Sequence, residues 1–371
     1  MHLNKNLIVT AILLGAASAA SAQSNVTIYG IVDASVTGDR GGANGGVNKV
    51  TSGAASASRI GFKGAEDLGD GVSAIFTLET GVKVDTGELD ATNTLFNRQA
   101  FVGLKSNTAG SVTLGRQYTA YHNALAQIAD PFGTGYAGGS KNLFPDSGTN
   151  VRTSNTVMYS TPSFSGVTAD VSYAAGEQAG SNDAGRQFGG SVGYANGPLN
   201  VRVAYNNKNT DVRSVVSIVN GVSTATVPVS HTIGHNTLLA ANYNFGIVRA
   251  YFGASFDKGF GSAPVAVANA YNSRVAPTAS LDGNEFLVGL SAPAGAGSIL
   301  ASVQHKNDKT SFNQDATGWG VAYLYPLSQR SNLYAAYASI NNKNGAGYTV
   351  QNNTEAGTGD KGFNLGFRHM F

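Results

Sequence analysis

The last nine residues of the chain read FNLGFRHMF (residues 363–371), with an apolar or aromatic side chain at almost every second position. One set of alternate positions holds Phe363, Leu365, Phe367, His369 and Phe371, and the other set holds Asn364, Gly366, Arg368 and Met370. Successive side chains of a β-strand point to opposite faces. The stretch therefore predicts a strand whose two faces meet different surroundings.

The same alternation recurs in many segments, for example near residues 72–79, 167–173, 199–206, 248–257 and 319–325. These segments run to about nine to twelve residues, whereas strands of soluble proteins peak near five or six. A tilted strand needs about nine to eleven residues to cross the hydrocarbon layer of a membrane. A soluble sandwich also alternates, so the connections between the segments have to decide between the two folds.

Short and long connections alternate along the chain. Turn-like links occur near residues 67–71, 107–110, 161–166, 196–198, 246, 293–297 and 326–330. Polar, glycine-rich links occupy residues 38–55, 83–96, 119–151, 176–185, 209–232, 258–281, 309–314 and 341–360. Eight long links and seven short turns imply sixteen strands, and this asymmetry is typical of outer-membrane β-barrels. Sixteen closed strands surround a water-filled lumen.

The composition excludes several classes of protein. The 371 residues contain no cysteine, which rules out disulfide frameworks, cysteine-based metal sites and thiol nucleophiles. Lysine and arginine together number 24 against 22 aspartate and glutamate, which is too balanced for a nucleic-acid-binding surface.

The N-terminus has the features of an export signal. Lys5 precedes an apolar stretch at residues 7–17, and Ala20-Ser21-Ala22 offers small residues for cleavage after Ala22. A membrane anchor is disfavoured, because a spanning helix needs roughly 20 apolar residues. We therefore expect a signal peptide at residues 1–22 and one membrane-spanning domain at residues 23–371.

Several stretches in order resemble the trimeric general porins of Gram-negative outer membranes, in particular the betaproteobacterial branch. They are VTIYGIVD (26–33), SRIGFKG (58–64), EDLG (66–69), NRQAFVGL (97–104), LGRQ (114–117) and GFRHMF (366–371). The resemblance implies an all-β, 16-stranded antiparallel transmembrane barrel with short periplasmic turns, long external loops and an inward-folded third loop. It also implies a homotrimer in outer-membrane lipid and lipopolysaccharide, with Phe371 as the signal recognised by the barrel-assembly machinery.

The third long link, residues 119–151, matches the family loop that narrows the pore. A segment of this length without regular structure is usually functional or disordered, and its aromatic residues favour packing inside the barrel. The resemblance implies a basic wall opposite this loop, formed by Arg59, Arg98 and Arg152 together with Lys63. In the alternation of side chains along a strand, Arg59 and Arg152 fall on the same face as polar or small neighbours, which should point to water. Arg98 falls on the same strand face as apolar residues, so only the resemblance places its side chain in the lumen.

On the loop side, the expected constriction residues are Asp130, Asp146, Phe132 and Tyr121. Phe132 follows Pro131 where the enterobacterial branch of the family carries a glutamate, so one carboxylate is missing. Basic residues then outnumber acidic ones at the constriction, and rings of arginine and lysine give anion-preferring pores. We expect a preference for small anions that is insensitive to pH until Asp130 protonates.

Arg116 has the parity of Val112 and Leu114 and should face outward, where an arginine in lipid would be costly. The resemblance implies a subunit contact at this position, with an acidic residue from the second loop of a neighbouring subunit. The acids available in that loop are Asp85, Glu88 and Asp90.

Other motifs are weak. Residues 133–138 fit a G-x-G-x-x-G pattern, but no strand–helix unit surrounds them. His231 and His235 have no evident third ligand for a metal. His122, His305 and His369 have no nucleophile-elbow context for a hydrolase. The sequence thus predicts no catalytic residue, no metal site and no cofactor.

The sequence predicts a porin that passes small hydrophilic solutes and inorganic anions by passive diffusion across the outer membrane. Two alternatives stay open. One is a substrate-selective channel for organic acids or sugars, which would need an aromatic track or a dedicated pocket in the lumen. The other is a closed surface barrel that acts as an adhesin, which would show almost no conductance.

Overall fold

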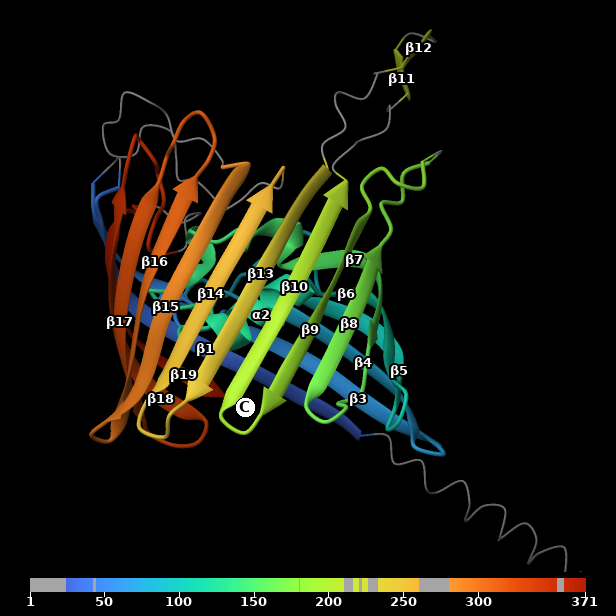
Figure 1. Ribbon diagram of the computed structural model, residues 1–371, viewed down its shortest axis with the longest axis horizontal. Helices are drawn as coiled ribbons and strands as arrows, with labels where there is room; N and C mark the ends of the chain where they lie inside the picture. Colours follow the sequence, from blue (N-terminus) through green and yellow to red (C-terminus); the bar gives the residue numbers. More distant parts are fainter. Residues whose placement is uncertain are drawn as a thin grey trace, which may run out of the picture.

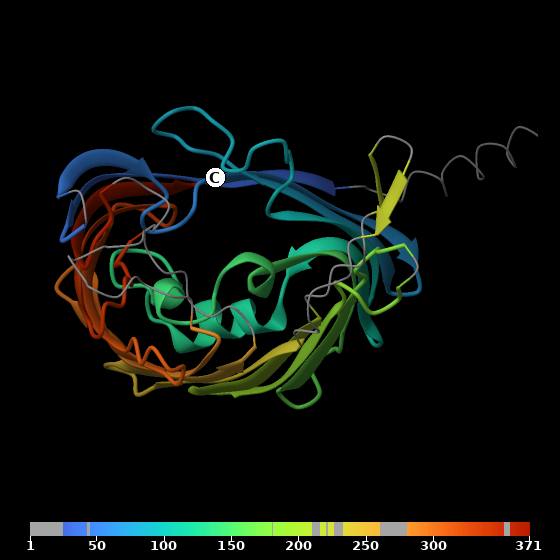
Figure 2. The same ribbon diagram turned by 90° about the horizontal axis from the view of Figure 1, so that it is seen from above.

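The computed structural model describes residues 25–42, 45–179, 181–209, 216–219, 222–225, 233–259, 280–351 and 357–371. The predicted signal peptide, residues 1–22, lies outside this part of the chain. The described residues form a tilted, closed β-barrel (Figures 1 and 2). Within them no helix is long and apolar enough to cross a membrane.

The barrel sheet is antiparallel and follows the order of the chain. Its first part comprises β1 (Asn25–Arg40), β2 (Val47–Ser52), β3 (Arg59–Gly69), β4 (Val72–Gly81), β5 (Gln99–Ser106) and β6 (Gly110–Tyr118). It continues with β7 (Arg152–Ser160), β8 (Val167–Ala174), β9 (Gln187–Asn196), β10 (Leu199–Asn209), β13 (Ile233–Asn244) and β14 (Arg249–Lys258). The last part comprises β15 (Asp282–Ala294), β16 (Gly297–Asp308), β17 (Ala316–Pro326), β18 (Ser331–Asn342) and β19 (Lys361–Met370). β11 (Val216–Val219) and β12 (Val222–Ala225) form a separate two-stranded sheet.

The first and last strands pair and close the sheet. Ten consecutive residue pairs join β1 to β19, from Ile31 opposite Met370 to Arg40 opposite Lys361. Beyond β19, the amide and carbonyl of Phe371 each bond to Gly30 at 3.1 Å. Of the seventeen strands in the sheet, β2 and β3 both pair with β1 and are two parts of one barrel strand. The predicted count of sixteen is therefore confirmed.

The strands alternate between a lipid-facing and a lumen-facing set of side chains, as β17 shows. Trp319, Val321 and Tyr323 are exposed on the outside, whereas Gly318, Gly320 and Ala322 between them are buried. Apolar side chains on the outer face fit a hydrocarbon surrounding. Small residues on the inner face let other segments approach the wall.

One such segment lies between β2 and β3. Residues 53–58 leave the sheet and are held by Asp33, whose carboxylate accepts the Ser56 amide at 2.9 Å. The carbonyl of Asp33 also accepts the amide of Gly53 at 2.8 Å. We predicted a single long link at residues 38–55, and this was wrong. The strands extend to Arg40 and restart at Val47, because pairing between Ala34–Asp39 and Val47–Ser52 satisfies both backbones.

The third loop, residues 119–151, lies inside the barrel (Figure 2). It contains α2 (Ala120–Ala124), the π-helical turn η2 (Leu125–Ala129) and the 3₁₀ turns η3 (Ser140–Asn142) and η4 (Gly148–Asn150). Thr119 caps the first turn, because its hydroxyl accepts the amide of His122 at 3.1 Å.

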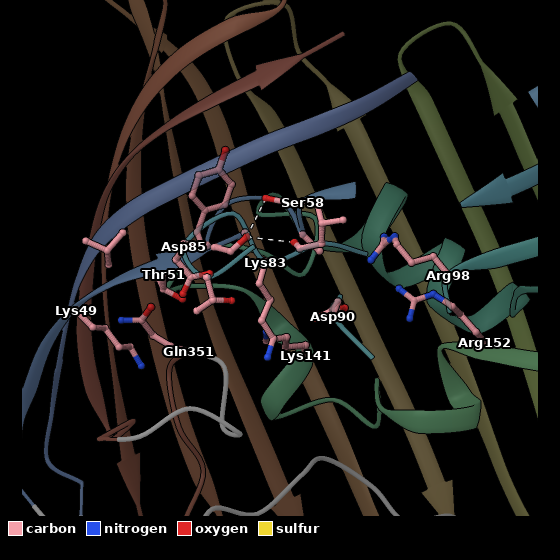
Figure 3. A pocket seen from close by; sticks show the side chains of 18 residues that line it. Lys49, Thr51, Ser58, Lys83, Asp85, Asp90, Arg98, Lys141, Arg152 and Gln351 are labelled. Carbon is pink, nitrogen blue, oxygen red and sulfur yellow. Dashed lines mark hydrogen bonds between the residues drawn. The ribbon is translucent and has the colours of Figure 1, made fainter. Parts of the chain in front are cut away.

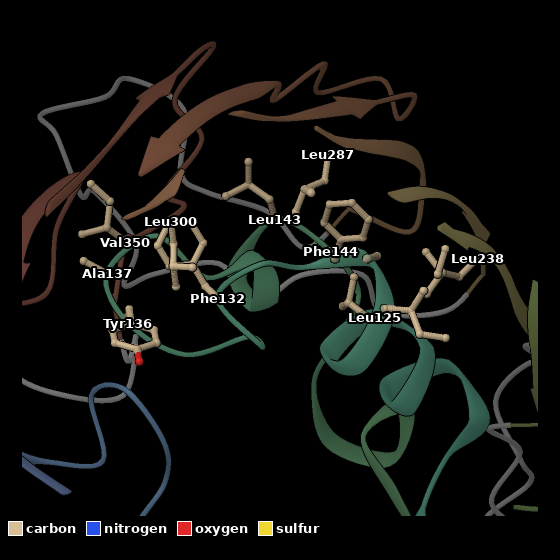
Figure 4. Close-up of a cluster of buried hydrophobic side chains, with 14 of the residues drawn as sticks. Leu125, Phe132, Tyr136, Ala137, Leu143, Phe144, Leu238, Leu287, Leu300 and Val350 are labelled. Atoms are coloured by element: carbon tan, nitrogen blue, oxygen red, sulfur yellow. The ribbon is translucent and has the colours of Figure 1, made fainter. Parts of the chain in front are cut away.

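Apolar packing holds the third loop against the wall. Leu125 and Phe144 of the loop are buried with Leu238 of β13 and Leu287 of β15 (Figure 4). Hydrogen bonds from the wall satisfy the loop's own polar groups: the Asn242 amide donates to the Ile128 carbonyl at 3.0 Å, and the Tyr121 and Ser255 hydroxyls lie 2.9 Å apart. The loop is thus fixed to one side of the lumen.

The last long loop also enters the lumen and covers the third loop. Tyr348 and Val350 are buried in the same apolar cluster as the third loop. The side-chain amide of Asn142 donates to the carbonyls of Thr349 and Gln351, both at 2.5 Å. Three segments therefore narrow the pore: residues 53–58, the third loop and the last long loop.

One close approach of the third loop to the wall needs glycine on both sides. A Cβ on Gly320 would lie 2.5 Å from the Cα of Gly138, and the Gln304 amide donates to the Gly138 carbonyl at 2.7 Å. No ordinary side chain fits between these two backbones.

We expect Gly320→Ala to push the third loop away from β17 and into the lumen. Overpacking of this kind costs about 1–3 kcal/mol of stability, and the narrower lumen should lower the single-channel conductance. Val321→Ala, on the outer face of the same strand, is the control and should leave conductance unchanged. An unaltered conductance in Gly320→Ala would contradict this contact.

Candidate functional site: the pore constriction

Two cavities in the lumen share part of their lining. One, of about 600 Å³, reaches toward the second loop and includes Lys49, Lys83 and Asp90, and the other, of about 920 Å³, includes Arg59, Tyr118 and Asp146. Both are lined by Gly53, Ala54, Ala57, Arg98, Lys141 and Arg152. We call these six shared residues the eyelet. Its two arginines, Arg98 and Arg152, lie on the same side of the first cavity (Figure 3).

The arginines stand where barrel strands begin. Arg59 is the first residue of β3 and follows the inward segment 53–58, and its Nε donates to the Ala57 carbonyl at 3.0 Å. Arg152 is the first residue of β7 and follows the third loop. Arg98 immediately precedes β5, so the alternation of that strand does not apply to it, and its side chain turns into the lumen. Because Arg98 lies outside the strand, the alternation of side chains along β5 does not predict the direction of its side chain.

A buried carboxylate lies among these arginines. Glu79 of β4 accepts the Arg98 Nε at 2.7 Å and lies 3.8 Å from Arg59 Nη1. Its other oxygen accepts the Tyr29 hydroxyl at 3.0 Å. Glu79 therefore neutralises part of the positive charge of the wall and orients Arg98.

Tyr118, the last residue of β6, lies between the wall and the third loop. Its hydroxyl accepts hydrogen bonds from Arg98 Nη2 and, at 3.2 Å, from Arg152 Nη2. The His122 ring stacks on the Tyr118 ring with centroids 4.9 Å apart. His122 Nδ1 in turn lies 2.8 Å from the carboxylate of Asp146.

Comparison with known proteins agrees with this architecture. The profile of the Gram-negative porin family matches residues 9–345. The chain belongs to this family. An outer membrane porin of Bordetella pertussis is 32% identical over 410 residues, and outer membrane porin protein 32 of Delftia acidovorans is 30% identical over 388 residues. Both alignments cover all of this chain and all of the relative.

Solved porin structures have the same fold. An anion-selective porin from Comamonas acidovorans superimposes with a TM-score of 0.73 at 28% identity, covering 94% of this chain and 100% of that one. A Salmonella typhi OmpF structure superimposes with a TM-score of 0.64 at 16% identity, covering 93% and 97%, and supports the fold alone.

Not all predicted wall residues reach the porin's constriction. Arg59, Arg98 and Arg152 line the larger cavity, but Lys63 does not. Lys63 is exposed, four residues further along β3, and its Nζ lies 5.2 Å from the centroid of the Tyr29 ring. Lys63 thus lies outside the lining of the larger cavity, because the face on which a residue stands does not set its depth along the strand.

Three of the predicted loop residues do not face the pore either. The Asp130 carboxylate is buried and accepts the amides of Phe132, Thr134 and Ser140 and the Ser140 hydroxyl, all within 2.7–3.0 Å. Burial raises the pKa of Asp130, and these hydrogen bonds act in the opposite direction. Phe132 and Tyr121 are also buried, in the packing of the loop. Both aromatic residues therefore stabilise the folded loop from within, as their expected packing inside the barrel implies.

Asp146 is the predicted loop acid that does line the larger cavity, where it is paired with His122. Lys141, which lines the eyelet from the loop side, was not predicted from the sequence, and neither were Glu79 and Tyr118. A signal existed for Glu79, since it has the lumen-facing parity of Ser73 and Thr77 in β4.

Arg116 and the acidic residues of the second loop have partners or cavity positions within their own chain. Arg116 Nε donates to the Asn97 carbonyl at 2.7 Å and Nη1 to the Ser154 hydroxyl at 2.9 Å. Glu88 lies 3.4 Å from Lys83 on the surface. Asp85 and Asp90 line the smaller cavity of their own chain.

Metal binding has no support in the described part of the chain. No group of three histidine, aspartate or glutamate side chains there has the arrangement of a metal site. His231, one of the two histidines considered above, lies outside the described residues.

We expect Glu79→Gln to increase the chloride preference of the pore, because the wall loses its buried negative charge. Leaving Arg98 without its carboxylate should also destabilise the barrel by about 3 kcal/mol. Reversal potentials in a KCl gradient and thermal unfolding measure the two effects. Glu66→Gln, at an exposed position of β3 near the turn to β4, is the matched control. A lower chloride preference in Glu79→Gln would contradict the assignment.

Proposed function

We propose that this porin is a passive diffusion channel of the outer membrane that prefers small anions, works as a homotrimer and is exported by means of residues 1–22. The observation that carries the anion preference is the composition of the eyelet. Its six residues include three cations and no carboxylate. The Comamonas relative described as anion-selective supports the same preference.

The positive charge acts on permeating ions in two ways. Low-dielectric protein walls focus the field of Arg98, Arg152 and Lys141 into the narrow lumen and raise the local concentration of anions. Arginine stays protonated throughout the physiological range, so the field of the two guanidiniums does not depend on pH. Asp130, turned into its own loop, does not oppose them.

An open diffusion channel is favoured over the two alternatives. The two cavities share the six eyelet residues in their linings, which supports conduction and disfavours a closed adhesin barrel. The walls of the eyelet carry charged and small side chains and no aromatic ring among its six residues. This composition supports charge-based preference more than a dedicated sugar site.

We expect the double variant Arg59→Ala/Arg152→Ala to lower the chloride-over-potassium permeability ratio about fivefold, because rings of basic residues set anion selectivity. The reversal potential of the purified protein in a planar bilayer under a KCl gradient gives this ratio. Lys105→Ala, at an exposed position of β5, is the control. Cation selectivity of the unaltered protein would overturn the proposed function, and absence of conductance would favour the closed barrel.

The trimer proposal rests on the resemblance at Arg116, and on an outer face over β1–β6 that exposes Val26, Val102 and Leu114. The proposed partner of Arg116 is an acid of the neighbouring second loop, Asp85, Glu88 or Asp90. Contact with lipopolysaccharide and recognition of Phe371 by the assembly machinery belong to the same proposal.

Arg116→Ala should lower the temperature at which the native oligomer dissociates on a gel, because a charge-assisted contact between subunits is lost. The monomers should keep their β-sheet circular dichroism. Arg330→Ala, at an exposed periplasmic turn, serves as the control. An unchanged dissociation temperature would argue against a subunit contact at Arg116.

A further inference from the structure

We propose that Tyr118 is the positioning residue of the anion filter, our name for the three wall arginines Arg59, Arg98 and Arg152. Its single hydroxyl oxygen accepts hydrogen bonds from two arginines and so holds two like-charged guanidinium groups together at the eyelet. The inference rests on the proposed function, since it names the residue that orders the charges on which anion preference depends.

The contacts at Tyr118 involve both its hydroxyl and its ring. The guanidinium carbon of Arg152 lies 4.6 Å from the ring centroid, and that of Arg98 lies 5.9 Å from it. Distances below about 6 Å are in the range of cation–π attraction. Tyr118 therefore attracts both cations without carrying a formal negative charge.

Arg152 depends on Tyr118 more than Arg98 does. Arg98 has the carboxylate of Glu79 as a second partner. Within the described part of the chain, the side-chain hydrogen bond of Arg152 is the one to Tyr118, and its buried Nε has no partner there. Removal of the Tyr118 hydroxyl should thus free Arg152 to adopt other rotamers.

The fold determines where Tyr118 stands. Tyr118 is directly opposite Arg152 in the pairing of β6 with β7. The third loop begins and ends at this pair, where the Thr119 amide donates to the Val151 carbonyl at 3.0 Å and the Thr119 hydroxyl donates to the Asn150 carbonyl. The closure of the loop therefore fixes Tyr118 and Arg152 relative to each other.

The third loop also supports the ring. His122 stacks on Tyr118 with an interplanar angle of 13°, and Asp146, near the other end of the loop, holds His122 Nδ1. A series of side-chain contacts therefore connects both ends of the loop to the filter, in the order Asp146, His122, Tyr118 and Arg152. A displaced loop would move the filter charges with it.

The test uses the purified full-length porin in planar bilayers, with Tyr118→Phe as the main variant. Phenylalanine keeps the ring and loses both charge-assisted hydrogen bonds, so we expect the chloride-over-potassium permeability ratio to fall about threefold. Open-channel current noise should rise, because Arg152 is no longer held in one rotamer. Tyr159→Phe is the matched control, since the Tyr159 hydroxyl bonds to the Ala109 carbonyl at the periplasmic end of β7.

A second pair of variants separates positioning from a merely structural role. If Tyr118 acts through Arg152, then Tyr118→Phe in an Arg152→Ala background should change the ratio by less than about 1.5-fold, as expected for coupled residues. His122→Ala keeps both hydroxyl bonds and removes the stacking partner, so it should shift the ratio in the same direction by a smaller factor.

The outcomes distinguish this inference from the proposed function. An anion-selective wild type whose ratio and noise are unchanged in Tyr118→Phe would overturn the role of Tyr118 alone. An equal fall of the ratio with and without Arg152 would overturn it as well, because the effect would not pass through that arginine. A cation-selective wild type would overturn the proposed function itself.

Discussion

The pairing of β1 with β19 is the constraint on which the rest of the structure depends. In a hydrocarbon layer every backbone N–H and C=O needs a partner within the protein, so a spanning sheet must close. Ten residue pairs, extended by the Phe371–Gly30 bonds, provide that closure. Closure at sixteen strands leaves a lumen too wide to be filled by wall side chains alone, and the inward segments narrow it.

The inward segments lie where the regular pairing of the barrel strands is interrupted. Residues 53–58 leave the sheet between two parts of one strand, and Asp33 supplies the hydrogen bonds that the missing ladder would have made. The third loop begins and ends at the Tyr118–Arg152 pair, where β6 ends and β7 begins. Arg59 and Arg152 each follow one of these departures. The charges of the filter therefore stand at the edges of the regular sheet, where side chains are free of strict alternation.

The sequence predicts the barrel well because period-two alternation reports on the surroundings of each strand face. Residues 363–371 show this directly, since Phe363 and Phe367 are exposed outside while Asn364 is buried inside. Alternation predicts which face of the sheet a side chain occupies, but it does not predict its depth along the strand, and Lys63 lies outside the lining of the larger cavity. It also does not tell which polar groups the protein uses internally. Asp130 resembles a pore acid in sequence and serves instead as the acceptor that folds its own loop.

How strongly the pore attracts anions depends more on the partners of its charged side chains than on the number of those side chains. Glu79 orders Arg98 and at the same time cancels part of its field, because an opposite charge at 2.7 Å forms a buried ion pair. Tyr118 orders Arg152 through a neutral oxygen, which leaves that guanidinium its full charge. A filter needs charges that are both fixed and uncompensated. A tyrosine between two arginines meets both requirements, whereas a carboxylate in the same place would meet only the first.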